Sequence, residues 1–428
     1  MATQPADALR PRRPRPWLCL GLFGLAALPR VIYLLVARPA FASYHWDVAD
    51  NLLQRGLIGD DDVKSTAYDT LYPVFLAGGR LLSGDRVLAI QALQIAIDSA
   101  GAVGLYFLVD ALTGQRRAAF VGAALYAFHP LLIRHSVVGD EFSLLSVLLI
   151  AFAYTVVTGV TLRRAAVAGL CLGLAILTRS TVAPLAVLTA AVFGFTRGVT
   201  TAIVFVLAAA AVVSPWLIRN YAVNGSLWPA RSGVNLFHGN SQYTAALLPE
   251  YNLDVLGEYS VDVVARNRPE LLGPAAEVEL DQYYMTLVWE EARARPLQAL
   301  RLVLAKVAYF FWPRLVPSRL RLPETSIVLL NDGQVHVENS PRRPILDEVA
   351  YTASYTLIAG AALVGMWLRR SSLKRDAVLW CIVVTFVTIS AIYFPATRYR
   401  VPMEFVLLFY AAVALDALPR SLAVRSLS

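Results

Sequence analysis

The sequence predicts an all-α polytopic membrane protein, a bundle of about ten transmembrane helices with two large segments on its outer side. Hydrophobic residues make up 57% of the 428 residues and charged residues only 16%, and the mean hydropathy is +0.56. Soluble domains carry roughly 45–50% apolar and about 25% charged residues. Apolar runs of membrane-spanning length also recur along most of the chain, with basic residues in the short loops between them.

The basic balance of the chain follows this topology. A net charge of +8 and an isoelectric point of about 9.4 would suggest nucleic acid in a soluble protein. Here the basic residues flank apolar runs, so we expect no nucleic-acid partner. Cys19, Cys171 and Cys381 lie inside apolar runs without a C-x-x-C pair, which argues against a disulfide framework and a thiolate metal site.

Apolar runs with basic flanks predict the helices in order. A basic tail, residues 1–16, precedes the first helix, residues 17–37, which we expect to be retained because no small-residue cleavage site ends it. The following helices are predicted at residues 87–112, 118–133, 141–160, 165–178, 181–195, 199–218, 351–368, 376–394 and 401–418.

Short basic loops predict the orientation. With a cytoplasmic N-terminus, every short basic loop falls on the cytoplasmic side, as the positive-inside rule requires. These loops contain Arg116, Arg117, Arg163, Arg164, Arg197, Arg369, Arg370, Lys374, Arg375, Arg420 and Arg425. We therefore expect a multi-pass protein of the inner (plasma) membrane with its active site facing the periplasm or exterior.

Two long segments fall on the outer side and divide the chain. Residues 17–218 form an N-terminal transmembrane module whose first outer loop is residues 38–86. Residues 219–350 form an extracytoplasmic segment, and residues 351–428 supply the last helices and a cytoplasmic tail. The run at 299–313 is predicted to be an interfacial or re-entrant helix, because a crossing there would place the basic loop at 369–375 outside.

The first outer loop carries the best-placed carboxylates. Asp47 and Asp50 follow the first helix among aromatic and imidazole groups, Tyr44 and His45, that could orient an acceptor. The spacing of the two aspartates suits one face of a short interfacial helix, and a carboxylate there could accept a proton from a hydroxyl. The alternative is that one or both aspartates only cap or solvate this helix.

A second outer turn adds His135 and Glu141 as acceptor-orienting groups. With a first-loop carboxylate or imidazole they could bind a divalent metal, so such a cofactor stays open. Acidic residues at this turn could equally cap the next helix at its N-terminus.

Basic residues on the outer side predict a cationic rim. The rim consists of Arg219, Arg231, Lys306, Arg398 and Arg400. Of these, Arg219, Arg398, Arg400 and Lys306 are the candidates for holding a lipid-linked phosphate by charge-assisted hydrogen bonds. Non-specific contacts with membrane lipid headgroups are the alternative. Arg30 and Arg179, in or beside apolar runs, are each expected to pair with a carboxylate, a helix end or an anionic ligand, with snorkelling to the headgroups as the alternative.

Several stretches together resemble a known family. They are Arg30 in the first helix, ADNLLQRG and LYPVFLA in the first outer loop, the HP and GDE turn, GLAILTRS, PWLIRNYAVNG, GVNLFHGN, ARPLQALRLVLAK and RYRVP. In order and spacing they are similar to the GT-C membrane glycosyltransferases, and within them to family 39-like proteins such as protein O-mannosyltransferases, lipid A aminoarabinose transferases and rhizobial lipopolysaccharide core transferases.

The resemblance implies an inverting transfer of a sugar from a polyprenyl-phosphate donor to an envelope glycan, glycolipid or protein acceptor on the outer face. It also implies a first-loop aspartate as the base, here Asp47, with Asp50 as its nearest rival. The sequence departs from the family where Tyr44 and His45 stand in place of its usual acid. It departs again where Asp69 and Thr70 replace the proline before LYP. The alternative function is a secondary transporter or lipid flippase, against which no similarity between the two halves is found.

Overall fold

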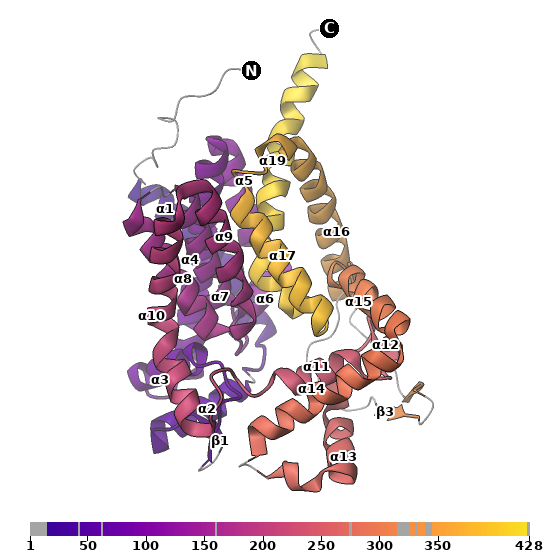
Figure 1. The fold of residues 1–428 in the computed structure, drawn as a ribbon. Helices are drawn as coiled ribbons and strands as arrows, with labels where there is room; N and C mark the ends of the chain where they lie inside the picture. The colour runs from indigo at the N-terminus through magenta and orange to yellow at the C-terminus, as the bar shows by residue number, and fades with distance from the viewer. Residues whose placement is uncertain are drawn as a thin grey trace.

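The computed structural model describes residues 15–41, 43–60, 63–158, 161–273, 276–314, 326–330, 333–338 and 345–425. The predicted tail at 1–16 therefore lies outside the described residues up to residue 14. The described chain is helical apart from two small antiparallel hairpins (Figure 1). This confirms the predicted helical class.

The N-terminal half contains ten α-helices and one hairpin within the described residues. The helices are α1 (Pro16–Ala37), α2 (Tyr44–Arg55), α3 (Leu71–Ser83), α4 (Val87–Thr113), α5 (Arg116–Phe128), α6 (Pro130–His135), α7 (Phe142–Thr158), α8 (Leu162–Thr178), α9 (Pro184–Arg197) and α10 (Val199–Asn224). The hairpin pairs β1 (Gly59–Asp60) with β2 (Val63–Lys64), and the 3₁₀ helix η2 (Ser180–Val182) precedes α9.

The C-terminal half adds shorter helices before the last apolar ones. They are α11 (Ser232–Asn240), α12 (Thr244–Leu247), α13 (Gly257–Asn267), α14 (Glu277–Ala294), α15 (Pro296–Phe310), α16 (Ile345–Leu368), α17 (Ala377–Ile392), α18 (Thr397–Arg400) and α19 (Glu404–Arg425). The second hairpin pairs β3 (Ser326–Leu329) with β4 (Val335–Glu338), Ile327 opposite Val337. Short 3₁₀ turns occur at η3 (Leu253–Leu256), η4 (Pro269–Leu272), η6 (Arg370–Ser372) and η7 (Val401–Met403).

Each predicted apolar run is helical, but the runs differ in length. Among the described residues, six helices are long and apolar enough to cross a membrane: Pro16–Ala37, Val87–Thr113, Ser180–Arg197, Val199–Asn224, Glu348–Leu368 and Thr397–Leu418. α7 and α17 are shorter apolar helices. The run at 118–133 divides at His129, because the residue before a proline is forced out of the helical region and Pro130 starts α6. A count of about ten crossings stays a prediction.

Close backbone contact joins α8 to α10. Gly169 and Gly173, one turn apart on α8, face α10 so closely that an added Cβ would overlap the carbonyl of Phe205 or approach Val212 Cβ to 2.7 Å. Small residues at this spacing let helices approach in lipid, where dispersion and not the hydrophobic effect drives association. The two glycines therefore fix α8, and the residues that follow it, against α10.

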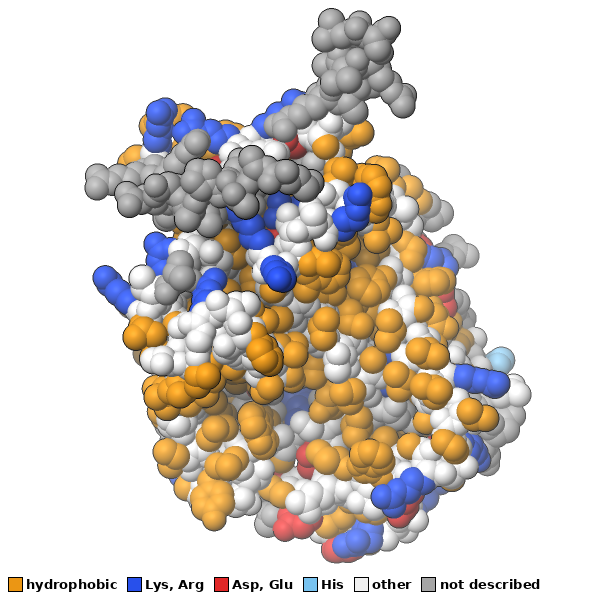
Figure 2. All heavy atoms as spheres, turned by 45° about the horizontal axis from the view of Figure 1, so that its top comes forward, with side chains coloured by type: hydrophobic (Ala, Val, Ile, Leu, Met, Phe, Trp, Pro, Cys, Tyr) orange, Lys and Arg blue, Asp and Glu red, His pale blue; other side chains and the backbone are white. Residues whose placement is uncertain are grey.

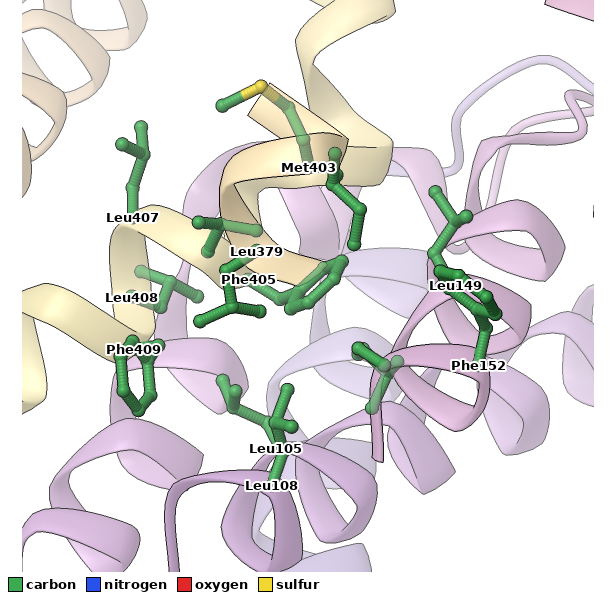
Figure 3. Packing of buried hydrophobic residues seen from close by; sticks show 14 of the residues in the cluster. Leu105, Leu108, Leu149, Phe152, Leu379, Met403, Phe405, Leu407, Leu408 and Phe409 are labelled. Atoms are coloured by element: carbon green, nitrogen blue, oxygen red, sulfur yellow. The ribbon is translucent and has the colours of Figure 1, made fainter. Parts of the chain in front are cut away.

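The core of the bundle is a continuous apolar cluster. Figure 3 shows side chains of α4, α7, α17 and the start of α19 meeting there. Leu105, Leu149, Phe405 and Phe409 are all buried. Large apolar side chains also remain exposed on the long helices, for example Leu35 at 62%, Leu207 at 63% and Leu363 at 67%. Such exposure is expected of helices that face lipid. Figure 2 shows hydrophobic side chains spread over one side of the molecule.

The two segments predicted to lie outside gather at one end of the bundle. Figure 1 places α2, α3, α11, α13 and α14 at the end opposite the start of α1 and the end of α19. That these segments lie outside the membrane stays a prediction. The side of the membrane that this end faces stays a prediction.

Candidate functional site

Acidic, basic and imidazole side chains from several elements meet at this end of the bundle. We call them the Glu141 cluster: His45 from α2, Asp69 from the loop before α3, Glu141 from the turn before α7, and Arg179 between α8 and η2. The ring of Tyr399 in α18 lies under the Arg179 guanidinium at 4.6 Å. Residues far apart in the sequence therefore share one site.

Glu141 is the centre of the cluster and is already fully engaged. His45 Nε2 lies 3.2 Å from Oε2, and Arg179 donates to Oε1. Burial raises the pKa of this carboxyl, but the hydrogen bond from His45 and the charge of Arg179 outweigh it and hold the pKa below its ordinary value. Glu141 is thus an ionised anchor and a poor proton acceptor.

Asp69 is the better proton acceptor of the cluster. Its carboxylate Oδ1 accepts the backbone N–H of Ser180 at 3.0 Å, and the residue is only half-buried. Burial raises its pKa, against the lowering effect of the nearby Arg179 charge. A carboxylate with a raised pKa that is not sequestered in an ion pair suits general-base chemistry. Sequence reasoning noted Asp69 only as a departure from the family's proline, and that departure was the available signal.

The end of α8 positions Arg179. The helix stops at Thr178, and Arg179 takes an extended backbone conformation while its N–H caps the Ala175 carbonyl at 2.9 Å. Its side chain then leaves the helix axis and packs over the Phe142 ring at 5.3 Å. Arg179 pairs with the carboxylate of Glu141, one of the three kinds of partner that the sequence predicted for it.

A second cation, Arg231, borders the cluster. Its guanidinium lies 5.1 Å from the Tyr44 ring and 6.0 Å from the Tyr68 ring. Within the described residues, no carboxylate lies at ion-pair distance from Arg231. The Tyr44 ring in turn lies 4.0 Å from the His45 ring, at an angle of 33°.

The two predicted first-loop aspartates lie away from the cluster. Asp47 is exposed and follows the buried His45 by two residues, which places it about 200° around α2 from that side chain. Asp50 accepts from Arg80 at 2.7 Å and from Gln54 at 2.7 Å. Asp50 therefore forms an ion pair with Arg80 of α3.

The predicted cationic rim does not form as one surface. Arg219 donates to the backbone carbonyls of Ile58 at 2.8 Å and Ser65 at 2.6 Å, so it fastens the first outer loop. Arg398 instead pairs with Asp254 at 3.2 Å. An arginine can donate hydrogen bonds to backbone carbonyls and carboxylates as readily as to phosphates. Arg219 and Arg398 do so here.

The remaining two rim residues are buried. Lys306 donates to the Asn240 side chain at 2.9 Å and to three backbone carbonyls. Arg400 pairs with Glu404 at 2.7 Å and donates to the Phe310 carbonyl at 3.0 Å. A buried cation is stable only when its donors are satisfied, and these two are satisfied by the protein. Neither is presented to a ligand in this structure.

The second outer turn divides its residues between two tasks. His135 Nδ1 lies 2.6 Å from Asp140 Oδ2, and Asp140 Oδ1 accepts the N–H of Phe142 at 3.3 Å at the start of α7. This acidic residue therefore interacts with the helix start, as the alternative reading proposed. Among the described residues, no three histidine, cysteine or acidic side chains lie close enough together to hold a metal ion.

Comparisons with known proteins bear on this geometry. Residues 70–218 match the family model of dolichyl-phosphate-mannose-protein mannosyltransferases, a stretch that contains Glu141 and Arg179 and begins one residue after Asp69. No curated protein matches the chain.

Solved structures of an oligosaccharyltransferase from the archaeon Archaeoglobus fulgidus share the fold. The complex of this enzyme, AglB, with an inhibitory peptide and a dolichol-phosphate is 15% identical, with a TM-score of 0.50 over 95% of this chain and 51% of that one. The form tethered to an acceptor peptide with the NVT sequon is 12% identical, with a TM-score of 0.53 over 96% and 51%. The apo form is 15% identical, with a TM-score of 0.52 over 96% and 52%.

The chain thus spans about half the length of the solved structures it matches. The family model covers residues 70–218, which is most but not all of the N-terminal transmembrane module, and the solved structures match nearly the whole of this chain. Together they confirm the resemblance of this chain to the GT-C membrane glycosyltransferases.

Proposed function

We propose that this protein is an inverting glycosyltransferase that moves a sugar from a polyprenyl-phosphate donor to a hydroxyl of an envelope glycan, glycolipid or protein. The observation that carries the proposal is a half-buried carboxylate with a raised pKa, Asp69, in a cluster that Arg231 borders. The Arg231 guanidinium lies against the Tyr44 and Tyr68 rings and has no ion pair among the described residues. The family match and the dolichol-phosphate of the solved relative support a lipid-linked donor.

In this mechanism Asp69 takes the proton of the acceptor hydroxyl. The acceptor oxygen forms a bond to the anomeric carbon while the bond from that carbon to the phosphate oxygen breaks. One displacement from the opposite face inverts the anomeric carbon. The lipid phosphate leaves with the bonding electron pair, and because phosphate is a good leaving group no general acid is required.

Arg231 is the proposed group that balances the charge on the leaving phosphate. A guanidinium matches phosphate oxygens with two parallel N–H donors, so it can hold the donor phosphate equally before and during the breaking of the sugar–phosphate bond. Its place against two tyrosine rings limits its motion, so the cation is held ready before the donor binds.

The other members of the Glu141 cluster are proposed to hold the site together. Glu141 fixes Arg179 and His45 through hydrogen bonds, which connects the first outer loop to the turn before α7, and the Tyr44 ring packs against His45. Asp47 stays a rival for the base, since it lies only three residues after Tyr44. We propose that the reaction takes place on the outer face of the inner (plasma) membrane, toward the periplasm or exterior.

The test is a transfer assay with purified protein in lipid vesicles. Polyprenyl-phosphate sugars labelled in the sugar are added with an envelope extract as acceptor, and free polyprenyl phosphate and the labelled product are measured. We expect both to form together, with inverted anomeric configuration by NMR. The Glu141→Gln variant is the control with a disassembled site. Movement of intact donor across the bilayer without its cleavage would establish the transporter alternative.

A further inference from the structure

We propose that α14 is a spacer that sets the distance between the proposed base and the proposed phosphate-binding cation. This inference rests on the proposed function. Glu277 and Asp281, one turn apart on α14, each hold a different loop. Glu277 holds the loop that leads to Asp69, and Asp281 holds the start of α11 just after Arg231.

Glu277 gathers several donors from the first outer loop and from α10. It accepts the Thr66 N–H at 3.0 Å, the Thr66 hydroxyl at 2.9 Å and the Asn224 amide at 3.0 Å, and Ser65 Oγ donates to its other oxygen. Thr66 itself is buried. Asp69 follows only three residues later, so the loop that carries it is anchored on the α14 side by Glu277 and at the cluster by Ser180.

Asp281 makes the corresponding contact with the second loop. Its Oδ1 accepts the Gly233 N–H at 2.6 Å in the first turn of α11. The approach requires glycine, because a Cβ at this position would overlap the Asp281 backbone carbonyl. Arg231 lies two residues earlier, so its backbone is set by the same contact. α11 continues along α14, with Phe237 and Tyr284 rings at 5.3 Å.

The two acids share one face of a rigid helix, since residues four apart on a helix are neighbours. The loop that carries Asp69 and the loop that carries Arg231 are therefore both held by the same helix, α14, which is part of neither loop. Neither acid touches the proposed reacting atoms, so both are positioning residues. A misplacement of about 1 Å at reacting groups can cost as much as 10²-fold in rate, which gives such a spacer a measurable effect.

Hydrogen exchange tests the two contacts without reference to activity. In the intact protein in vesicles, Glu277→Ala is expected to speed exchange of the Thr66 amide by about tenfold and to leave the Gly233 amide unchanged. Asp281→Ala is expected to do the reverse. Glu279→Ala is the matched control, because Glu279 is exposed on the same helix and carries the same charge. Glu277→Gln keeps the side-chain size and serves if Glu277→Ala does not fold.

Kinetics then separate positioning from general destabilisation. Glu277→Ala should lower kcat about tenfold or more with the donor KM within about twofold, since it releases the base loop. Asp281→Ala should raise the donor KM about tenfold with kcat nearly unchanged, since it releases the cation loop. Glu279→Ala should match the native protein in both.

Three results would decide against the spacer. One is wild-type exchange at both amides in both variants. Another is an equal loss in the same kinetic parameter for Glu277→Ala and Asp281→Ala, which would indicate only a less stable fold. The third is an effect of Glu279→Ala as large as theirs. If the native protein transfers no sugar at all, the proposed function fails, while the exchange data still judge the two contacts.

Discussion

Two buried arginine and carboxylate pairs in this molecule are built differently. In the bundle, Arg30 of α1 donates to Asp98 of α4 at 2.5 Å and to the carbonyls of Ala26 at 2.6 Å and Ala127 at 2.9 Å. Tyr126 donates to the second oxygen of Asp98 at 3.1 Å. Both charged side chains are 0% exposed, so this network is closed on itself.

At the site end, the Arg179 pair is left open. The Arg179 side chain keeps 21% of its surface exposed while it pairs with Glu141, and Asp69 beside it is half-buried. Arg231 adds a guanidinium that lies against the Tyr44 and Tyr68 rings and has no ion pair within the described residues. We infer from this comparison that the buried Arg30–Asp98 network joins helices. The partly exposed groups around Arg179 leave hydrogen-bond acceptors and positive charge that a ligand could contact. Changes in the open network should therefore affect turnover, and changes in the closed one should affect stability.

The largest expected effect is that of Asp69→Asn on turnover. Asparagine keeps the size and can still accept the Ser180 N–H, but it cannot take a proton. We expect kcat to fall by roughly 10²–10⁴, the contribution of a general base, with the donor KM little changed. Because the pKa of Asp69 is raised by burial, the native rate should increase with pH until this carboxyl is ionised. The transfer assay over a pH series measures both.

Asp47→Asn is the matched control for this prediction. It makes the same chemical change at an exposed position on α2 and should leave kcat within about threefold of the native value. If Asp47→Asn is inactive while Asp69→Asn is active, Asp47 is the general base, as predicted from the sequence. The first outer loop would then have to rearrange on binding.

The second prediction concerns the closed network. Asp98→Leu leaves Arg30 buried without its carboxylate and should cost about 3–5 kcal/mol of unfolding free energy. The kcat of the molecules that remain folded should stay close to the native value. Thermal or denaturant unfolding in detergent measures the first quantity, and activity per folded molecule the second.

The double variant Arg30→Met with Asp98→Leu sharpens the test. It removes both charges and should recover much of the lost stability, because the desolvation penalty disappears with the pair. If the double variant loses turnover while it remains stable, the closed network also serves the site, and the comparison of the two networks is wrong.

The fold was largely predictable from the sequence, for a physical reason. Lipid demands that every backbone group be paired within a helix, so apolar runs alone locate the helices. The pattern could not show that the run at 118–133 breaks at His129. It also could not locate α3 or α14, whose polar and apolar residues are mixed, because their burial depends on other elements.

The site was only partly predictable. The sequence selected Tyr44, His45 and Glu141 as neighbours in function, and the structure brings His45 and Glu141 to 3.2 Å across 96 residues of sequence. It could not select Asp69, whose role depends on the Ser180 N–H that meets it. The sequence also grouped the outer-side basic residues into one rim, whereas the hydrogen-bond partner of each residue depends on how the helices pack. Lys306 is surrounded by carbonyls that no pattern reveals.

The third prediction tests the open charge. Arg231→Ala should weaken donor use by about 1.5–3 kcal/mol, the range for a hydrogen bond to a charged group, which appears as a roughly tenfold or greater rise in donor KM. Arg266→Ala is the control, since Arg266 lies exposed on α13 in the same segment. An effect confined to the acceptor KM would assign Arg231 to the acceptor and leave the phosphate without its proposed partner.

The smallest effect is expected from Asp281, through the pH dependence of stability. Burial raises the pKa of Asp281 from an ordinary 3.8 to about 6, although the Gly233 N–H lowers it. Folding therefore favours the protonated carboxyl. The stability that this group contributes is complete below about pH 4 and is lost as the pH rises through about 6. Asp281→Asn, which is neutral at every pH, should flatten this part of the profile.

The measurement is the melting temperature Tm between pH 4 and pH 7 for the native protein, Asp281→Asn and Glu279→Ala. The native protein and Glu279→Ala should lose a few degrees more than Asp281→Asn across this range, because only they retain the buried titrating carboxyl. A parallel loss in all three would place the pH dependence elsewhere. A steeper loss in Asp281→Asn would mean that the ionised carboxylate is the form that holds Gly233, and that the contact strengthens as the pH rises.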